Sequence, residues 1–484
     1  MNRKHPHLSL LRVVLEATTP LSIGTGAGDL QQDVVLARDH NDLPTLPGTA
    51  IAGVLRHLAR TLGYDKAAVE SLFGPEVETL REPPTDTGLL ASRLNVSHGL
   101  IHDFRDIPVE RLLPLADIAA DPLLALAVKP QPGRRDHVRL NQRGVVDQRG
   151  KFERSLLPAG YRFTVEFALW SETVDDAAWA ILIALIGDPR FRLGGATRRG
   201  YGGMAVARAH HRRFDLRDAV DFQDFSQLNR SLEDTPLSTW QILAMPTTAL
   251  ARLAWTELTL TPTDFWRFGQ GEKPLGQYGA EKLPDLLQVT GTKVCRSTDG
   301  KAQLRFDQIV IPASALKGAL AHRFAFHYNR HRGYFIDGDD QDQSLPVDDA
   351  NDGVKTLFGY VAQDGAALAG LLVIDDALLL DDTKVAPVRL THNAIDRFTG
   401  GVRAGFLYSE EVLNDGRFKL VVTLLDCGDS RLSQPGIRAA LDDTLADLCE
   451  GRLPLGGGVN KGHGSVTGTR GPWSLASWGR ETKA

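Results

Sequence analysis

Two glycine-rich segments of this chain carry the residue types that bind phosphate groups. One contains Gly194, Gly195, Gly200 and Gly202 with Arg198 and Arg199, and the other contains Gly456, Gly457, Gly462 and Gly464 with Lys461 and His463. Glycine lets the backbone turn sharply enough to point several N–H groups at one anion. We therefore favour a turn that places backbone N–H groups and a cation, Arg199 or Lys461, against phosphates.

Two other interpretations of these segments are possible. A mononucleotide site is disfavoured, because neither segment spells GxGxxG, and Tyr201 stands where a P-loop needs lysine. The second segment also lacks Gly-Lys-Ser/Thr. The plain structural alternative, a tight turn whose glycines need a positive φ, stays open.

Charge is segregated along the chain. A formal net charge of −5 and a pI near 6.3 count mildly against nucleic-acid binding. However, acidic residues gather at about 337–352, while one hairpin-like region is rich in arginine: Arg134, Arg135, Arg139, Arg143, Arg149 and Arg154. A local basic surface is sufficient for a phosphate backbone.

Other familiar chemistry has little support. His327 and His331 are four residues apart and could form a metal pair, but no adjacent glutamate completes a protease motif. A Gly-x-Ser-x-Gly nucleophile motif is absent. The three cysteines are odd in number and lack metal-ligand spacing, so we expect a reduced, cytoplasmic protein. No apolar run approaches 18 residues, and no membrane role is expected.

The glycine segments belong to a longer duplication, since the second follows the first at a constant offset of 262 residues. Four earlier pairs occur in the same order: 47–53 with 312–318, 72–74 with 357–359, 88–90 with 370–372, and 138–140 with 388–390. A period of this length indicates two fused domains. We predict a first domain at 1–215, a linker at 216–250, a second domain at 251–474 and a tail at 475–484.

The predicted elements have the same order in both copies. Each copy opens with a strand (10–17 and 253–261), then a helix that begins near Thr49 or Ser314, where the hydroxyl could cap it. Further strands (163–169 and 420–425) and a second helix (177–186 and 437–448) precede each glycine segment and a closing strand. The order predicts an α+β fold of two tandem ferredoxin-like (RRM-like) domains. The base-stacking aromatics of an ordinary RNA-recognition module are absent.

These motifs, taken in order, resemble the RAMP superfamily, and most closely the backbone subunits of type III CRISPR effector complexes. The similarity rests on Pro-Gly-Thr-x-x-x-Gly at the first helix, Leu-Phe-Gly, Val-Arg-Leu and the late glycine segment, and it covers both copies. The resemblance implies partners: a guide crRNA, a complementary target RNA, other RAMP backbone subunits, and the large and small subunits of such a complex. It also implies a thumb hairpin in each copy, at about 137–156 and 387–408, which interrupts the RNA duplex. Asp147 and Asp396 occupy matching places in these hairpins.

The resemblance places a catalytic aspartate in the loop after the first strand, before a short strand that ends in Arg-Asp. Here that residue is Asp33, ahead of Arg38 and Asp39, with Asp29 as its rival. Asp33 would position a divalent cation, Mg²⁺ or Mn²⁺, that polarises the scissile phosphate while the RNA 2′-hydroxyl attacks. The second copy has no matching aspartate, so we expect the first copy to cut RNA and the second only to bind it.

Candidate RNA-binding residues follow from the resemblance and the glycine segments. Lys317 stands where the family usually has lysine, whereas the first copy has Ala52 there, and Arg56 would substitute. The full set is Thr49, Arg56, Arg139, Arg143, Asp147, Gly194, Gly195, Arg198, Arg199, Gly200, Gly202, Ser314, Lys317, His322, Arg323, Arg389, Arg397, Gly456, Gly457, Lys461, Gly462, His463 and Gly464.

Four alternative functions stay open on the sequence alone. The chain could be a purely architectural subunit, or an end-capping one, of the same complex. It could be a guide-processing endoribonuclease, which would use a histidine or tyrosine base without metal. A small-molecule enzyme on a duplicated fold is the last, because fold alone does not fix function.

Overall fold

The structure is a computed structural model that describes residues 5–26, 34–75, 92–140, 145–233, 239–245, 252–269, 271–279, 283–334, 350–361, 367–380, 384–475 and 478; the side chains of 147–149 are not described. Within these ranges, none of the helices has the length and apolar character needed to span a bilayer. The predicted acidic segment lies almost wholly outside the described residues.

The first half is built on an antiparallel sheet with ferredoxin-like strand order. Its strands are β1 (His7–Ala17), β2 (Leu94–Val96), β3 (Leu100–Ile101), β6 (Arg162–Ser171) and β7 (Met204–Asp215). The order is β2-β6-β1-β7, with β3 also paired to β6, so β1 is central. In β1, Leu11, Val13 and Leu15 are fully buried, as expected for alternate residues that face one side of a sheet.

Helices cover one face of this sheet. They are α1 (Gly48–Thr61), α2 (Lys66–Phe73) and α5 (Ala177–Ile186), and two short helices, α3 (Leu115–Ala120) and α4 (Pro122–Ala127), follow β3. The predicted apolar face of α1, Ile51, Leu55 and Leu58, packs in the same core as β1.

The second half repeats this plan. Its strands are β9 (Ala254–Pro262), β14 (Leu372–Ile374), β15 (Ala377–Leu379), β18 (Phe418–Leu424) and β19 (Val466–Arg470), in the order β15-β18-β9-β19 with β14 on β18. Its helices are α7 (Ala313–His331), α8 (Asp352–Phe358) and α9 (Ile437–Cys449), with the 3-10 turns η4 (Ser430–Ser433) and η5 (Val459–Lys461) and a small ribbon, β12 (Gly359–Val361) with β13 (Ala367–Ala369). The predicted tandem ferredoxin-like fold is confirmed.

One detail of the helix starts is wrong in the sequence analysis. Neither Thr49 nor Ser314 caps its helix, because α1 and α7 are preceded by Pro47 and Pro312, and neither helix has a side-chain cap. In α7 the carboxylate of Asp376 accepts a hydrogen bond from the first helical N–H, that of Ala313, at 2.8 Å.

The predicted linker at 216–250 lies between the end of β7 and the start of β9. Part of it packs against the first half. It contains α6 (Ala219–Ser226) and β8 (Gln241–Ile242), which pairs with β7. Trp240 packs with Leu8, Leu10 and Phe214 on the sheet face opposite the helices. Both faces of the first sheet are therefore covered along part of β1.

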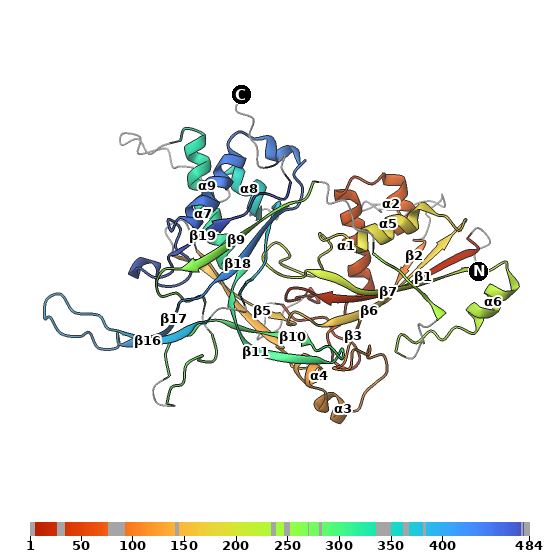
Figure 1. The fold of residues 1–484 in the computed structure, drawn as a ribbon, viewed down its shortest axis with the longest axis horizontal. Coiled ribbons are helices and arrows are strands. Elements are labelled where there is room, and N and C mark those ends of the chain that lie inside the picture. The colour runs from red at the N-terminus through yellow and green to blue at the C-terminus, as the bar shows by residue number, and fades with distance from the viewer. Residues whose placement is uncertain are drawn as a thin grey trace.

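Three hairpins project from the sheets. They are β4 (Gly133–Leu140) with β5 (Val146–Leu156), β10 (Thr290–Arg296) with β11 (Ala302–Ile311), and β16 (Ala386–His392) with β17 (Tyr408–Asn414). The second of these continues the sheet of the second half, because β11 pairs with β15, whereas the other two form separate ribbons. The first and third coincide with the predicted thumbs, and we call them hairpin one and hairpin two. Hairpin two extends away from the body of the molecule (Figure 1).

The β10–β11 hairpin belongs to the second half but docks on the first. Val294 and Ala302 are buried in the first core, and their N–H groups donate to the carbonyls of Ala159 and Phe104, both at 2.8 Å. Arg296 lies 3.7 Å from Asp106. The two halves therefore share a continuous interface.

Candidate nucleic-acid interface

The two glycine segments have the same backbone conformation. We call 193–203 loop one and 455–464 loop two. Gly194 and Gly456 have φ of 86° and 87°, and Gly200 and Gly462 have φ of 88° and 89°. These values lie in the left-handed region, where only glycine is unstrained. The positive-φ alternative considered from the sequence is therefore correct for both loops, whatever else they bind.

Several loop N–H groups are already used within the protein. Gly195 donates to the Ser22 carbonyl, and Gly457 donates to the Arg267 carbonyl, both at 2.8 Å. Each loop is also closed by a bond between its ends, from Leu193 to Gly202 and from Leu455 to Gly464. These amides hold the loops in shape, so phosphate contact falls to the exposed part of each loop and its cation.

The two loops differ in what surrounds them. In loop one, Gly200 is buried, and a Cβ added there would lie 2.7 Å from the Cβ of Ala313 at the start of α7. In loop two, a Cβ added at Gly462 would meet nothing within 4 Å. The prediction that Gly200, Gly202 and Gly464 contact RNA directly is wrong. All three glycines are buried by surrounding protein. Gly194 and Gly456 are exposed.

A cluster of charges lies where loop one meets the second half. We call it the junction cluster: Arg135, Arg192, Arg198, Arg199, Lys317, Asp375 and Asp376. Its recorded ion pairs join Arg135 to Asp376 at 3.1 Å and Arg192 to Asp375 at 2.5 Å. The cations outnumber the carboxylates, so the cluster carries net positive charge. The Arg199 side chain is exposed at its edge.

Lys317 is not placed as the sequence predicted. Its Nζ donates to the carbonyls of Arg198 at 3.1 Å and Leu372 at 3.2 Å, and the residue is 7% exposed. Burial, and then the charges of Arg199 and Arg198, lower the pKa of this amine to about 7. Lys317 therefore joins the two halves instead of presenting a free charge to RNA. Arg198 is also engaged, because its Nε donates to the Gly370 carbonyl at 3.1 Å.

Asp33 and Asp29 lie outside the described residues, but the base of their loop is visible. Residues 23–25 pair with 35–37: Thr25 donates to Val35 at 3.0 Å and Ala37 donates to Ile23 at 2.8 Å. The same base packs on loop one, since a Cβ added at Gly194 would lie 3.0 Å from Ile23. The described base of this loop, loop one and Arg154 of hairpin one therefore adjoin one another, since Arg154 Nη1 lies 3.4 Å from Ser22 Oγ.

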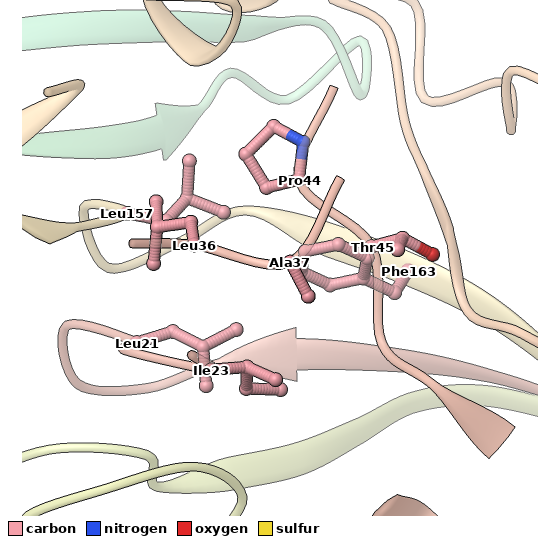
Figure 2. A pocket seen from close by; sticks show the side chains of 8 residues that line it. All are labelled: Leu21, Ile23, Leu36, Ala37, Pro44, Thr45, Leu157 and Phe163. Atoms are coloured by element: carbon pink, nitrogen blue, oxygen red, sulfur yellow. The ribbon is translucent and has the colours of Figure 1, made fainter. Parts of the chain in front are cut away.

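Beneath that loop base is a small apolar gap of about 10 Å³. Figure 2 shows Leu21 and Ile23 facing Leu36 and Leu157 across it. The gap is no larger than one water molecule needs and has an apolar lining, so it is a packing defect and not a ligand pocket. The segment before Arg38, predicted as a short strand, forms isolated bridges instead, Gly24 with Leu36 and Arg38 with Pro44. Arg38 donates to the carbonyls of Lys129 at 2.5 Å and Ala127 at 3.3 Å and so ties this segment to the end of α4.

The structure describes only some of the residues of hairpin one that are predicted to contact RNA. Arg139 is exposed, whereas Arg143 and the side chain of Asp147 lie outside the described residues. His137 is buried: its Nε2 lies 3.2 Å from the Tyr201 hydroxyl, and its ring stacks on Phe152. Burial and the charges of nearby arginines lower the pKa of His137 to about 4.

Hairpin two presents an apolar, cationic tip. Phe398 is fully exposed, and Arg397 beside it is exposed too. Asp396 orders the turn, because its Oδ1 accepts from the N–H groups of Phe398 at 3.0 Å and Thr399 at 2.9 Å. A preformed tip with a bare aromatic ring suits insertion between bases.

At the base of hairpin two lies a cluster that the sequence analysis missed. Glu410 is buried between Arg267, at 3.1 Å, and His392, at 2.7 Å, and Lys461 of loop two contacts the Tyr408 hydroxyl. Arg389 donates to Ser409 Oγ at 3.2 Å nearby. His463, predicted to contact RNA, is instead buried beneath loop two. No motif could have found this cluster, since Arg267 and Glu410 are 143 residues apart.

The helix cations predicted to bind RNA are mostly engaged. Arg56 donates to the carbonyl of Gly74 at the end of α2. Arg323 pairs with Asp447 of α9, which also contacts His327 Nε2 at 2.7 Å. The prediction that Arg56 and Arg323 contact RNA is therefore wrong, because both side chains join neighbouring helices. His322, like Thr49, is exposed and stays a candidate.

The His327–His331 pair is not a metal site. His331 Nε2 lies 2.7 Å from Asp443, so each histidine is taken by a different carboxylate of α9. Across the described ranges, no group of three or more His, Cys, Asp and Glu side chains is arranged to hold an ion. Asp33 lies outside those ranges; a cation held by its carboxylate together with phosphate oxygens and water would have a coordination that Mg²⁺ accepts.

Comparison with known proteins agrees with the geometry. A family model described as the RAMP superfamily matches two regions, residues 14–205 and 299–467. The two matches fall on the two ferredoxin-like halves and together cover most of the chain. A search of curated proteins finds no match.

Proposed function

Because the chain belongs to the RAMP superfamily through both of its halves, we propose that it is a double backbone subunit of a type III CRISPR effector complex. It binds the guide crRNA across the two halves, holds the complementary target RNA against the guide, and cuts the target at one site in the first half. Its neighbours are other RAMP backbone subunits and the large and small subunits of that complex.

The junction cluster is the observation that supports RNA binding best. Five cations and two carboxylates meet where loop one contacts the second half, with Arg199 exposed at the edge. A net positive, partly buried site attracts phosphates strongly, since salt screens such charges less than surface ones. Exposed cations of the two hairpins, Arg139, Arg389 and Arg397, extend the basic surface to both sides.

The target would be cut beside the Asp33 loop. Hairpin one and loop one adjoin the base of that loop, so a nucleotide displaced by the hairpin would lie near the base of the segment that carries Asp33. A divalent cation held by Asp33 would supply Lewis-acid polarisation of the scissile phosphate. Arg154 and the loop one backbone would hold the adjoining phosphates, and the nucleotide's own 2′-hydroxyl would be the nucleophile.

The experiment that tests this proposal is purification of the chain from its host, with sequencing of the RNA that copurifies. Uniform short RNAs that share a repeat-derived end are expected, and random RNA or none would overturn guide binding. Labelled complementary target is then added with Mg²⁺ to wild type, Asp33→Ala and, as the matched control, Asp29→Ala. Loss of the metal-dependent cut in Asp33→Ala alone is expected. If Asp33→Ala binds guide and the metal-dependent cut is undiminished, Asp33 is not the cutting residue, and the chain would be a purely architectural subunit.

A further inference from the structure

The base of hairpin two and loop two together form a constellation of acid–base groups. His392 ends β16, Tyr408 and Glu410 begin β17, and Lys461 ends η5 in loop two. The hairpin register pairs His392 with Tyr408 and Leu390 with Glu410, so the strands fix these side chains on one ribbon. The four groups therefore come from rigid elements that face one another.

Glu410 holds the histidine. Its carboxylate lies 2.7 Å from His392 Nε2 and 3.1 Å from Arg267 Nε, and it is 1% exposed. Burial alone would raise the pKa of Glu410, but the hydrogen bond and charge of Arg267, with His392 and Lys461, lower it, so Glu410 is ionised. The negative charge of a carboxylate this close to Nε2 favours the tautomer with its proton on Nε2, although the contact is not an aligned hydrogen bond, and this tautomer leaves Nδ1 as a base.

Lys461 and Tyr408 complete the constellation. The Lys461 amine contacts the Tyr408 hydroxyl, lies 4.9 Å from the centre of its ring and is 3.9 Å from Glu410. The rings of His392 and Tyr408 stack at 5.0 Å. The side chain of His392 is 24% exposed and that of Lys461 is 40% exposed. A base and an acid therefore reach solvent side by side, while the carboxylate that orients the base stays buried.

We propose that this constellation is a second, metal-independent RNA-cutting site in the second half, acting on target RNA displaced by hairpin two. The inference rests on the proposed function, because the proposed pairing with the guide delivers the strand. His392 Nδ1 takes the proton of a ribose 2′-hydroxyl, and the 2′-oxygen attacks the adjacent phosphorus. The bond from phosphorus to the 5′-oxygen breaks, and that oxygen takes a proton from the Lys461 ammonium. The products are a 2′,3′-cyclic phosphate and a 5′-hydroxyl, and proton exchange with water restores both side chains.

The first half has no counterpart of this constellation among its described residues. An arginine lies beside the second glycine of the loop in both halves, since a Cβ added at Gly195 would lie 2.9 Å from Arg154 and one added at Gly457 would lie 2.9 Å from Arg267. The histidine of hairpin one, His137, is buried and bonded to Tyr201, and its pKa of about 4 would make it a weak base. The two halves thus differ in chemistry: an aspartate loop in one, and a histidine–glutamate pair in the other.

The test uses the full chain carrying Asp33→Ala, loaded with guide RNA, with labelled complementary target and EDTA. A cut that resists EDTA is expected, with a cyclic phosphate end, and a single 2′-deoxy nucleotide at the cut position should abolish it. His392→Ala and Lys461→Ala, each added to Asp33→Ala, should each slow this cut at least about 100-fold. His331→Ala, at an exposed histidine at the end of α7 that pairs with Asp443, is the matched control and should leave the rate unchanged.

Glu410 is a positioning residue in this scheme and needs a different readout. Glu410→Gln keeps the shape but removes the charge that fixes the tautomer, so the pH at which the rate is half-maximal should fall as well as the rate. Guide affinity of each variant is measured alongside, to separate folding from chemistry. No EDTA-resistant cut in a chain that binds guide and target would overturn this inference and leave the proposed function standing. A wild-type chain that binds no guide would overturn both.

Discussion

Lys317 Nζ in the second half lies 3.1 Å from the Arg198 carbonyl oxygen in the first half. A residue expected to contact RNA thus links the two halves of the protein through a hydrogen bond. Ala313, four residues earlier in α7, packs against Gly200 of the same loop. Loop one and the start of α7 therefore form a single structural unit, and its stability can be probed apart from RNA binding.

The first prediction concerns the pH dependence of Lys317. Its folded pKa of about 7 is below the unfolded value near 10.4, so between these pH values the unfolded chain binds more protons. Stability should therefore rise with pH in that window. Wild type should gain about 2 kcal/mol more than Lys317→Met between pH 7 and pH 9, measured by urea denaturation. Lys301→Met, at an exposed turn, is the control and should track wild type.

The second prediction compares Gly200→Ala with Gly462→Ala. Both sites have φ near 88°, so each substitution should cost roughly 1–2 kcal/mol from backbone strain. Only Gly200→Ala also overlaps Ala313, which should add roughly 1–3 kcal/mol. Thermal unfolding should show the larger loss for Gly200→Ala. Equal losses would mean that loop one is not clamped by α7 in solution.

A third prediction addresses Arg199 at the edge of the junction cluster. Arg199→Ala should weaken guide binding and reduce the slope of log affinity against log salt by about one, because one phosphate contact is lost. Titrations of labelled guide at several salt concentrations measure both quantities. Arg217→Ala, an exposed arginine paired with Asp215 beyond β7, should change neither. An unchanged slope in Arg199→Ala would remove this residue from the RNA path.

Phe398 at the tip of hairpin two gives the fourth prediction. Since its side chain is fully exposed, Phe398→Ala should leave the unfolding temperature unchanged. It should restore base pairing where hairpin two interrupts the guide–target duplex, which chemical probing of unpaired target bases would detect. Phe306→Ala, another exposed phenylalanine but on β11, should leave the probing pattern as in wild type. The prediction fails if the unpaired bases persist without the Phe398 ring.

The sequence alone predicted the fold because its signals are local. Glycines that need positive φ, such as Gly194 and Gly456, recur at fixed spacing, and the apolar period of α1 and α7 shows which face is buried. A duplicated pattern then reports a duplicated domain. These features depend on residues within a few turns of one another.

The roles of single cations could not be predicted, because their partners are distant in sequence. Lys317 meets Arg198, 119 residues away, and Arg323 meets Asp447, 124 residues away. The same limit hid Glu410, whose partners Arg267 and His392 come from different elements. Asp33 and Asp29 lie outside the described residues, so the assignment of Asp33 stays a prediction.

The unequal surroundings of the two loops give the molecule a direction. Loop one packs against α7 of the second half. Loop two has the same backbone conformation, but there is open space at Gly462. If loop two received the corresponding helix of another unit in the same way, the units would join head to tail, and the resulting array would be polar.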